Sequence, residues 1–284
     1  MNLKERAERF PGDEHKAGEE HYRAYIDAPD NYDLMAAMQF NLMTGLGLRQ
    51  YHRLLDIGCG SLRAGRLFIP YLLPGRYFGI EPNQWLIDQA IEHEVGRDLI
   101  RIKTPQFSNS SDFDLTSFGV MFDFIIAQSV FTHAPPRPIA LCLSKAREVM
   151  TKESIFVSNW AEDDTSYDGD EWVYPDFVKY AASRIDEFMS DAGLVARRLN
   201  WTKPPSGQSW FVITRQDFPN IEKLTDPFAS SRELVKTEEK LKFCEEQLDR
   251  LYWVLRRVTG SGRKDERRVP RDAPASPPDP GQEV

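Results

Sequence analysis

The sequence has few cysteines, no long apolar run and no excess of positive charge. Its three cysteines, Cys59, Cys142 and Cys244, are far apart and form no CxxC pair, which argues against a disulfide framework or a structural zinc site and favours a reducing cytoplasm. No run reaches the roughly eighteen apolar residues of a membrane span, and the charged first residues lack the apolar core of a secretory signal. The net charge of −8 argues against a general nucleic-acid binder.

The 284 residues divide into four regions. Residues 1–50 predict a helical N-terminal cap. Residues 51–219 alternate short β-rich runs with helical runs, a pattern typical of an α/β domain with a mostly parallel sheet and helices on both faces. Residues 228–259 predict one long helix, and residues 260–284, rich in Gly, Arg, Asp and Pro, predict a disordered tail.

Leucines recur every seven residues in the long helix, at Leu234, Leu241, Leu248 and Leu255. The positions three residues later are Thr237, Cys244, Leu251 and Val258, and Glu and Lys are frequent beside them. Such an a/d seam predicts a coiled coil, which would form a homodimer or bind a partner helix. The alternative is an amphipathic helix that packs on its own domain.

The strongest motif is Leu55-Asp56-Ile57-Gly58-Cys59-Gly60, between a predicted strand and a predicted helix. Its glycines let the backbone approach a ligand, and the helix N-terminus beyond offers free N–H groups. A dinucleotide site would need a third glycine where the sequence has Arg63, and Asp56 would repel a pyrophosphate. Asp56 suits a ligand that carries an ammonium group. The alternative is an ordinary tight turn.

A second acidic residue, Glu81, ends the next predicted strand about twenty residues beyond the glycines, as the ribose-binding acid of nucleotide sites does. Its carboxylate could accept both ribose hydroxyls, and Pro82 restricts the backbone that follows. The alternative is an acid favoured by the dipole of a helix N-terminus.

Together with Tyr77-Phe78-Gly79-Ile80-Glu81-Pro82 and the run 122–133, these motifs make residues 50–215 resemble the class I SAM-dependent methyltransferases. The resemblance implies a Rossmann-like sheet of seven strands with a C-terminal antiparallel hairpin. It also implies S-adenosyl-L-methionine (SAM) as cofactor. The expected reaction is methyl transfer to a small polar acceptor, either a sugar hydroxyl, another hydroxyl or an amine.

The resemblance further implies the cofactor contacts. These are Asp56, Gly58, Cys59, Gly60, Arg63, Glu81, Pro82, Asp112, Phe113, Gln128 and Ser129. Glu81 would hold the ribose, Asp112 and Phe113 would flank the adenine, and Gln128 and Ser129 would line the methionyl side. Arg63 could pair with the carboxylate of SAM. It could equally be a solvated side chain in the first helical turn.

His133 follows the strand before the expected acceptor entrance. A histidine there could act as general base on a hydroxyl, or it could simply orient the loop. Tyr22, Trp160 and Trp172 are candidate acceptor contacts, and the last two lie near the acidic stretch 162–171. That stretch could recognise a cationic or polyhydroxyl acceptor, or be a solvated loop. We expect no metal there, because no nearby histidine supports one.

Two other functions are compatible with parts of the sequence. A non-catalytic module could keep the SAM fold and recruit a partner through the coiled coil. A nicotinamide-dependent oxidoreductase is disfavoured by Arg63 and Asp56, as argued above.

Overall fold

The computed structural model describes residues 14–228 and Leu248. They belong to two units, 1–229 and 230–284, and the fold described below is that of the first. Apart from Leu248, which is helical, the expected coiled-coil seam of 228–259 and the tail 260–284 lie outside the described residues. The homodimer therefore stays a prediction.

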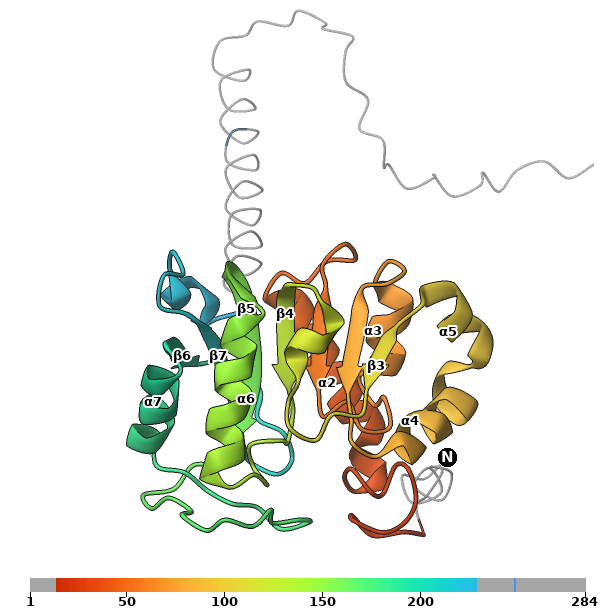
Figure 1. Ribbon diagram of the computed structural model, residues 1–284, viewed down its shortest axis with the longest axis horizontal. Helices are drawn as coiled ribbons and strands as arrows, with labels where there is room; N and C mark the ends of the chain where they lie inside the picture. Colours follow the sequence, from red (N-terminus) through yellow and green to blue (C-terminus); the bar gives the residue numbers. More distant parts are fainter. Residues whose placement is uncertain (1–13, 229–247, 249–284) are drawn as a thin grey trace, which may run out of the picture. The chain divides into compact units, whose positions relative to one another are not determined.

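The described strands form one seven-stranded sheet with the order β3-β2-β1-β4-β5-β7-β6 (Figure 1). Their bounds are β1 Leu54–Ile57, β2 Tyr77–Ile80, β3 Gln106–Ser108, β4 Phe122–Ala127, β5 Met150–Trp160, β6 Leu194–Arg198 and β7 Ser209–Arg215. The first five are parallel, and β7 runs antiparallel between β5 and β6. The expected mostly parallel sheet with a C-terminal antiparallel hairpin is confirmed.

Helices cover both faces of the sheet. The α-helices are α2 Tyr32–Gly45, α3 Gly65–Tyr71, α4 Gln84–Ala90, α5 Arg97–Lys103, α6 Pro136–Glu148 and α7 Ala182–Asp191. Shorter turns are η1 Pro29–Asn31, η2 Ile91–Val95, η3 Leu115–Phe118 and η4 Ile221–Leu224. Apolar residues of α6 and α7 share one core cluster with the sheet, while those of α2, α3 and α4 share the other. Both faces of β1 and β2 are therefore buried, which explains their continuous apolar sequences.

The helix after the glycine motif starts later than the sequence predicts. The sequence predicts a helix directly after the glycine motif, but residues 60–64 form turns and α3 begins at Gly65. Leu62 has a left-handed backbone, with φ of +52°, and a helix cannot contain such a residue. The delay leaves the loop after β1 long enough to curve around a ligand.

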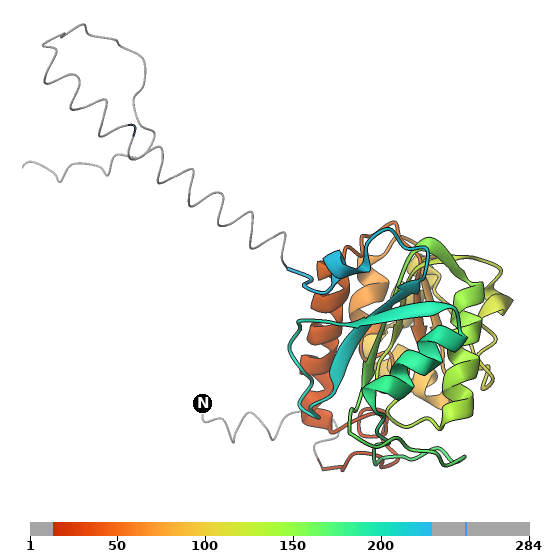
Figure 2. The same cartoon turned by 90° about the vertical axis from the view of Figure 1, so that its left-hand side faces the viewer.

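Two segments outside the sheet lie at the carboxyl ends of the parallel strands, at the bottom of Figures 1 and 2. The first, residues 14–28, forms turns rather than the predicted helix, and we call it the strap. The second is the β5–α7 loop, residues 161–181. They touch through Tyr25 and Tyr174, whose ring centroids are 5.7 Å apart. The strap and the β5–α7 loop thus meet over the carboxyl ends of the strands.

Among the described residues, no helix is both long and apolar enough to cross a membrane.

Trp160, the last residue of β5, is completely buried. Its ring packs against Phe131 at 4.8 Å and Phe188 at 6.2 Å, measured between ring centroids. Its indole N–H donates to Ser158 Oγ at 2.9 Å. Trp160 was a candidate acceptor contact, but the structure places it in the hydrophobic core. Helix α7 shields it from solvent.

We predict that Trp160→Ala lowers the free energy of unfolding by about 3–5 kcal/mol, because it leaves a large cavity in the core. Trp160→Phe should cost clearly less. Urea titration followed by circular dichroism measures both changes. A loss under about 1 kcal/mol for Trp160→Ala would contradict the core placement.

Candidate active site

A cavity opens where the strand order reverses, between the loops that follow β1 and β4. In open α/β sheets this is the place where ligands bind. The cavity encloses about 420 Å³, within the range of small-molecule sites. The strap and the β5–α7 loop contribute Tyr25, Trp172 and Tyr174 to its wall.

The glycine motif forms the floor of the cavity. Gly58 and Gly60 both have left-handed backbones, with φ of +68° and +52°. The N–H groups of Gly58 and Cys59 donate to the carbonyl of Ile80, which ties the loop to the end of β2. A Cβ at Gly58 would lie 2.7 Å from Val130 Cγ2. Only glycine fits this position without moving the side chain of Val130.

Asp56 is almost completely buried at the end of β1 and borders the cavity. It accepts a hydrogen bond of 2.8 Å from the hydroxyl of Tyr77. Burial raises the pKa of this carboxyl group to about 7, against the opposing effects of the Tyr77 hydrogen bond and of Arg63. A cationic ligand group would favour its charged form.

Glu81 is a second buried carboxylate, at the end of β2. Oε2 accepts from the N–H of Gly60 at 3.1 Å, and Oε1 accepts from the backbone and side-chain nitrogens of Asn83 at 2.9 and 3.0 Å. Burial raises the pKa of Glu81, although these hydrogen bonds oppose the shift. A carboxylate has about four acceptor sites. A second ribose hydroxyl would therefore compete with the Asn83 side chain.

Arg63 is buried and borders the cavity. Nη1 pairs with Asp27 of the strap at 3.1 Å, and Nη2 donates to the side-chain oxygen of Gln128. It is thus no solvated first-turn side chain. No other arginine or lysine of the described residues lines the cavity, so Arg63 is its positive group.

The loop after β4 is held by a chain of polar contacts. Gln128 donates to Ser129 Oγ at 2.5 Å, and the backbone N–H of Ser129 donates to Asn159 Oδ1 at 2.7 Å. Ser129 has φ of +56°, an unusual conformation for a residue other than glycine. The buried Asn159 at the end of β5 stabilises it. The amide of Gln208 in turn accepts from Asn159.

His133 borders the cavity and is mostly buried. Its Nδ1 lies 2.9 Å from the carbonyl oxygens of both Val173 and Asp176. Carbonyls only accept, so Nδ1 carries the proton and the neutral ring leaves a lone pair on Nε2. Nε2 has no hydrogen-bond partner in the part of the chain that the structure describes. Burial lowers the pKa of His133, which favours this neutral form at pH 7.

The structure brings most of the expected residues to one cavity. Those that line it are Asp56, Gly58, Cys59, Gly60, Arg63, Glu81, Pro82, Phe113, Gln128, Ser129, His133 and Trp172. Asp112 is exposed and binds Ser110 at 2.6 Å instead, so Ser110 and Ser111 take its place in the wall. Trp160 lies in the core. Tyr22 is buried outside this cavity, where it donates to Glu94 at 2.9 Å.

Sequence reasoning did not assign Tyr25, Gln39, Asn83, Leu86 and Tyr174 to the site, although all five line the cavity. Asn83 could have been inferred from its place two residues after Glu81. Tyr25 and Tyr174 come from segments without a motif, and only the tertiary structure brings them to the site.

Residues 55–156 match a family model described as a methyltransferase domain. Over these residues the chain contains a methyltransferase domain. The methyltransferase domain, the enzyme class and the SAM cofactor expected from the motifs are confirmed. The cavity fits that cofactor, because it combines a bare glycine floor, buried carboxylates and one arginine. A comparison with curated protein sequences finds no match.

Solved methyltransferase structures share the fold of this domain. The mitomycin 7-O-methyltransferase MmcR is 15% identical, with a TM-score of 0.50 over 68% of this chain and 56% of that chain. DesVI from Streptomyces venezuelae is 17% identical, with a TM-score of 0.47 over 67% and 99% of the two chains. The sugar N-methyltransferase KedS8 from Streptoalloteichus is 15% identical, with a TM-score of 0.48 over 64% and 88%.

The raised pKa of Asp56 predicts a pH-dependent cost to stability. At low pH the Asp56 carboxyl group is protonated in both the folded and the unfolded state. Between about pH 4 and pH 7 it is protonated only in the folded state. The free energy of unfolding therefore falls as pH rises through this range. Asp56→Asn removes this cost and can still accept from Tyr77. The variant should therefore gain stability relative to wild type as pH rises from 4 to 8.

Urea unfolding at several pH values measures the difference between the two proteins. Asp88→Asn is the matched control, because Asp88 is exposed and accepts a hydrogen bond from Gln84. If Asp56→Asn became less stable than wild type with rising pH, the assigned shift of Asp56 would be wrong.

Proposed function

We propose that the protein transfers the methyl group of SAM to a hydroxyl group of a small polar acceptor, with His133 as general base. The observation that carries this proposal is the fixed ring of His133, which borders the cavity with its protonated Nδ1 near two carbonyls and with no hydrogen-bond partner on Nε2 among the described residues. A hydroxyl acceptor loses its proton on methylation. A neutral imidazole is suited to receive it near pH 7.

The remaining roles follow the environments of the side chains. Glu81 would bind the ribose with the acceptor capacity that Gly60 and Asn83 leave free. Gln128 and Ser129 would line the methionyl side, supported by Asn159. SAM supplies an activated methyl group on a sulfonium. Positioning of the acceptor oxygen in line with that group can provide much of the rate enhancement.

The acceptor would enter below the aromatic side chains of Tyr25, Trp172 and Tyr174. Trp172 and Tyr174 remain 50% and 41% exposed, so both have ring surface free to contact a ligand. Aromatic rings of this kind pack on the flat faces of sugars and other small rings. A sugar or another small hydroxyl compound is therefore the acceptor that we propose.

We predict that calorimetric titration detects micromolar binding of SAM and of S-adenosylhomocysteine, and none of NAD. Glu81→Ala should weaken the adenosyl ligands by about a hundredfold, because it removes charge-assisted hydrogen bonds. Glu153→Ala, at an exposed position on β5, is the control. Binding of NAD in place of SAM would contradict the proposal.

The role of His133 predicts a pH profile. An acceptor is first found by testing a panel of hydroxyl compounds for the production of S-adenosylhomocysteine. With that acceptor, kcat/KM should rise with pH as His133 loses its proton and then reach a plateau. The midpoint of the rise should lie below the usual histidine pKa of 6.5. His133→Gln should lower kcat by about 10²–10⁴-fold and abolish that profile. His52→Gln, which alters a histidine before β1, should change neither.

The profile also tests the alternative of a non-catalytic module. Such a module would bind SAM without turnover on any acceptor. If the His133→Gln variant were active with an unchanged pH profile, methyl transfer would still be supported. His133 would then be excluded as the general base.

A further inference from the structure

One carboxylate of the strap pairs with a charged side chain of the cofactor site. Asp27 Oδ2 lies 3.1 Å from Nη1 of Arg63, the positive group of the cavity. The Asp27 side chain is 33% exposed, so the ion pair does not use all of its surface. Asp27 also acts electrostatically on His133 and Tyr174, two further cavity residues.

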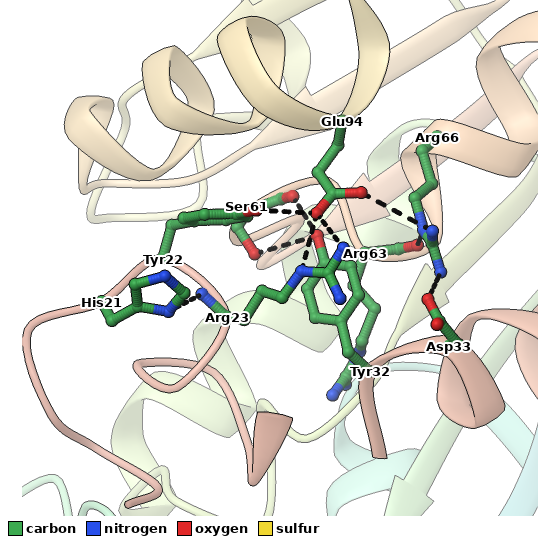
Figure 3. A network of polar contacts seen from close by, with 9 residues as sticks. All are labelled: His21, Tyr22, Arg23, Tyr32, Asp33, Ser61, Arg63, Arg66 and Glu94. Carbon is green, nitrogen blue, oxygen red and sulfur yellow. Dashed lines mark hydrogen bonds and ion pairs between the residues drawn. The ribbon is translucent and has the colours of Figure 1, made fainter. Parts of the chain in front are cut away.

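A polar network fixes the strap beside the glycine loop (Figure 3). Its centre is the buried carboxylate of Glu94, which accepts from Tyr22 Oη at 2.9 Å and from Arg23 Nε at 2.7 Å. Nη2 of Arg23 lies 2.5 Å from the same carboxylate, and Nη1 of Arg66 lies 3.6 Å from its other oxygen. Buried charges of this kind are stable only when they are paired. Loss of the strap would leave Glu94 partly unpaired.

Tyr32 connects this network to the cofactor loop. The centroid of its ring lies 4.4 Å from Cζ of Arg23 and 5.0 Å from Cζ of Arg66, so two guanidinium groups contact this ring. Its hydroxyl donates to the carbonyl of Ser61 at 2.8 Å, directly after the glycine motif. The strap and the glycine loop are thus held as one piece.

The residues just before Asp27 are also packed in place. Tyr25 contacts Trp85 at 5.3 Å and Tyr174 at 5.7 Å between ring centroids. Ile26 lies over the bare face of Gly60, where an added Cβ would be 3.0 Å from its Cγ2. Asp27 therefore has little freedom to leave Arg63.

An arginine–aspartate pair matches the amino-acid end of SAM, which carries a carboxylate and an ammonium group. Arg63 uses one N–H of Nη1 for Asp27 and one of Nη2 for Gln128, which leaves three of its five donors free. The second oxygen of Asp27 accepts from the N–H of Ala28 at 2.7 Å, and a carboxylate oxygen can accept one more hydrogen bond. Asp56, in contrast, is almost fully buried and already accepts from Tyr77.

We propose that Asp27 and Arg63 together bind the amino-acid end of the cofactor, with Arg63 holding the carboxylate and Asp27 holding the ammonium group. The strap then supplies part of the cofactor site and is required for binding. The proposal rests on the proposed function in that SAM is the cofactor. It assigns a cofactor contact outside the sequence motifs.

The test compares two ligands that differ in this end alone. S-adenosylhomocysteine carries the amino-acid end, whereas 5′-methylthioadenosine lacks it. By calorimetry, Asp27→Asn should weaken S-adenosylhomocysteine by about tenfold, the effect of losing one hydrogen bond to a charged group, and change 5′-methylthioadenosine by less than about twofold. Arg63→Gln should show the same selectivity.

Asp33→Asn is the matched control, because Asp33 pairs with Arg66 as Asp27 pairs with Arg63, but Arg66 does not line the cavity whereas Arg63 does. It should leave both affinities unchanged, and thermal melting should confirm that each variant is folded. Equal weakening of both ligands by Asp27→Asn would show a merely structural role and overturn the proposal. Unchanged binding of S-adenosylhomocysteine by Asp27→Asn would also overturn the proposal. Tighter binding would overturn it too, because it would mean that Asp27 competes with the ligand for Arg63. If wild-type protein bound neither ligand, the proposed function itself would fail.

Discussion

The parallel pairing of β1 with β2 and β4 is the constraint on which the site depends. Asp56 lies opposite Gly79 on one side and Ile126 on the other, so the three strands end at the same edge of the sheet. The chain then leaves each strand into a different loop, and a crevice opens between the loops after β1 and β4. Glu81 at the end of β2 binds back to Gly60, which fixes two of these loops to each other.

The charges of the crevice follow from burial. Asp56 and Glu81 both lose water contact, and burial raises the pKa of each. Among the described residues, Arg63 is the only arginine or lysine that lines the cavity. It is already paired with Asp27. Such a site attracts cationic or zwitterionic groups more than anions. The sulfonium and the amino-acid end of SAM have that character, whereas the pyrophosphate of a dinucleotide does not.

The roof of the cavity comes from segments with no part in the sheet. The strap is held by the Glu94 network, and the β5–α7 loop is held partly by His133, which binds the carbonyls of Val173 and Asp176. The same hydrogen bonds therefore orient the ring of His133, the proposed base, and hold the β5–α7 loop against it. Aromatic packing between Tyr25 and Tyr174 joins the two segments, so that the cofactor and acceptor sides share one cover.

The sequence alone determined the sheet, the floor of the site and the cofactor. These depend on local patterns: apolar runs predict strands, paired glycines predict a left-handed turn, and an acid at the next strand end predicts the ribose contact. The bounds of β2, β3 and β4 agree with those patterns. The N-terminal cap was predicted to be helical, but residues 14–28 form turns, because their conformation depends on Glu94 and Arg63.

Only the tertiary structure decided which side chains reach the cavity. Trp160 and Trp172 are equally aromatic in the sequence, but α7 covers the first and leaves the second exposed. Asp27 and Tyr174 meet Arg63 and Tyr25 only after the chain closes loops of many residues. No local pattern encodes such contacts, because they arise from burial and charge pairing between segments that are far apart in the sequence.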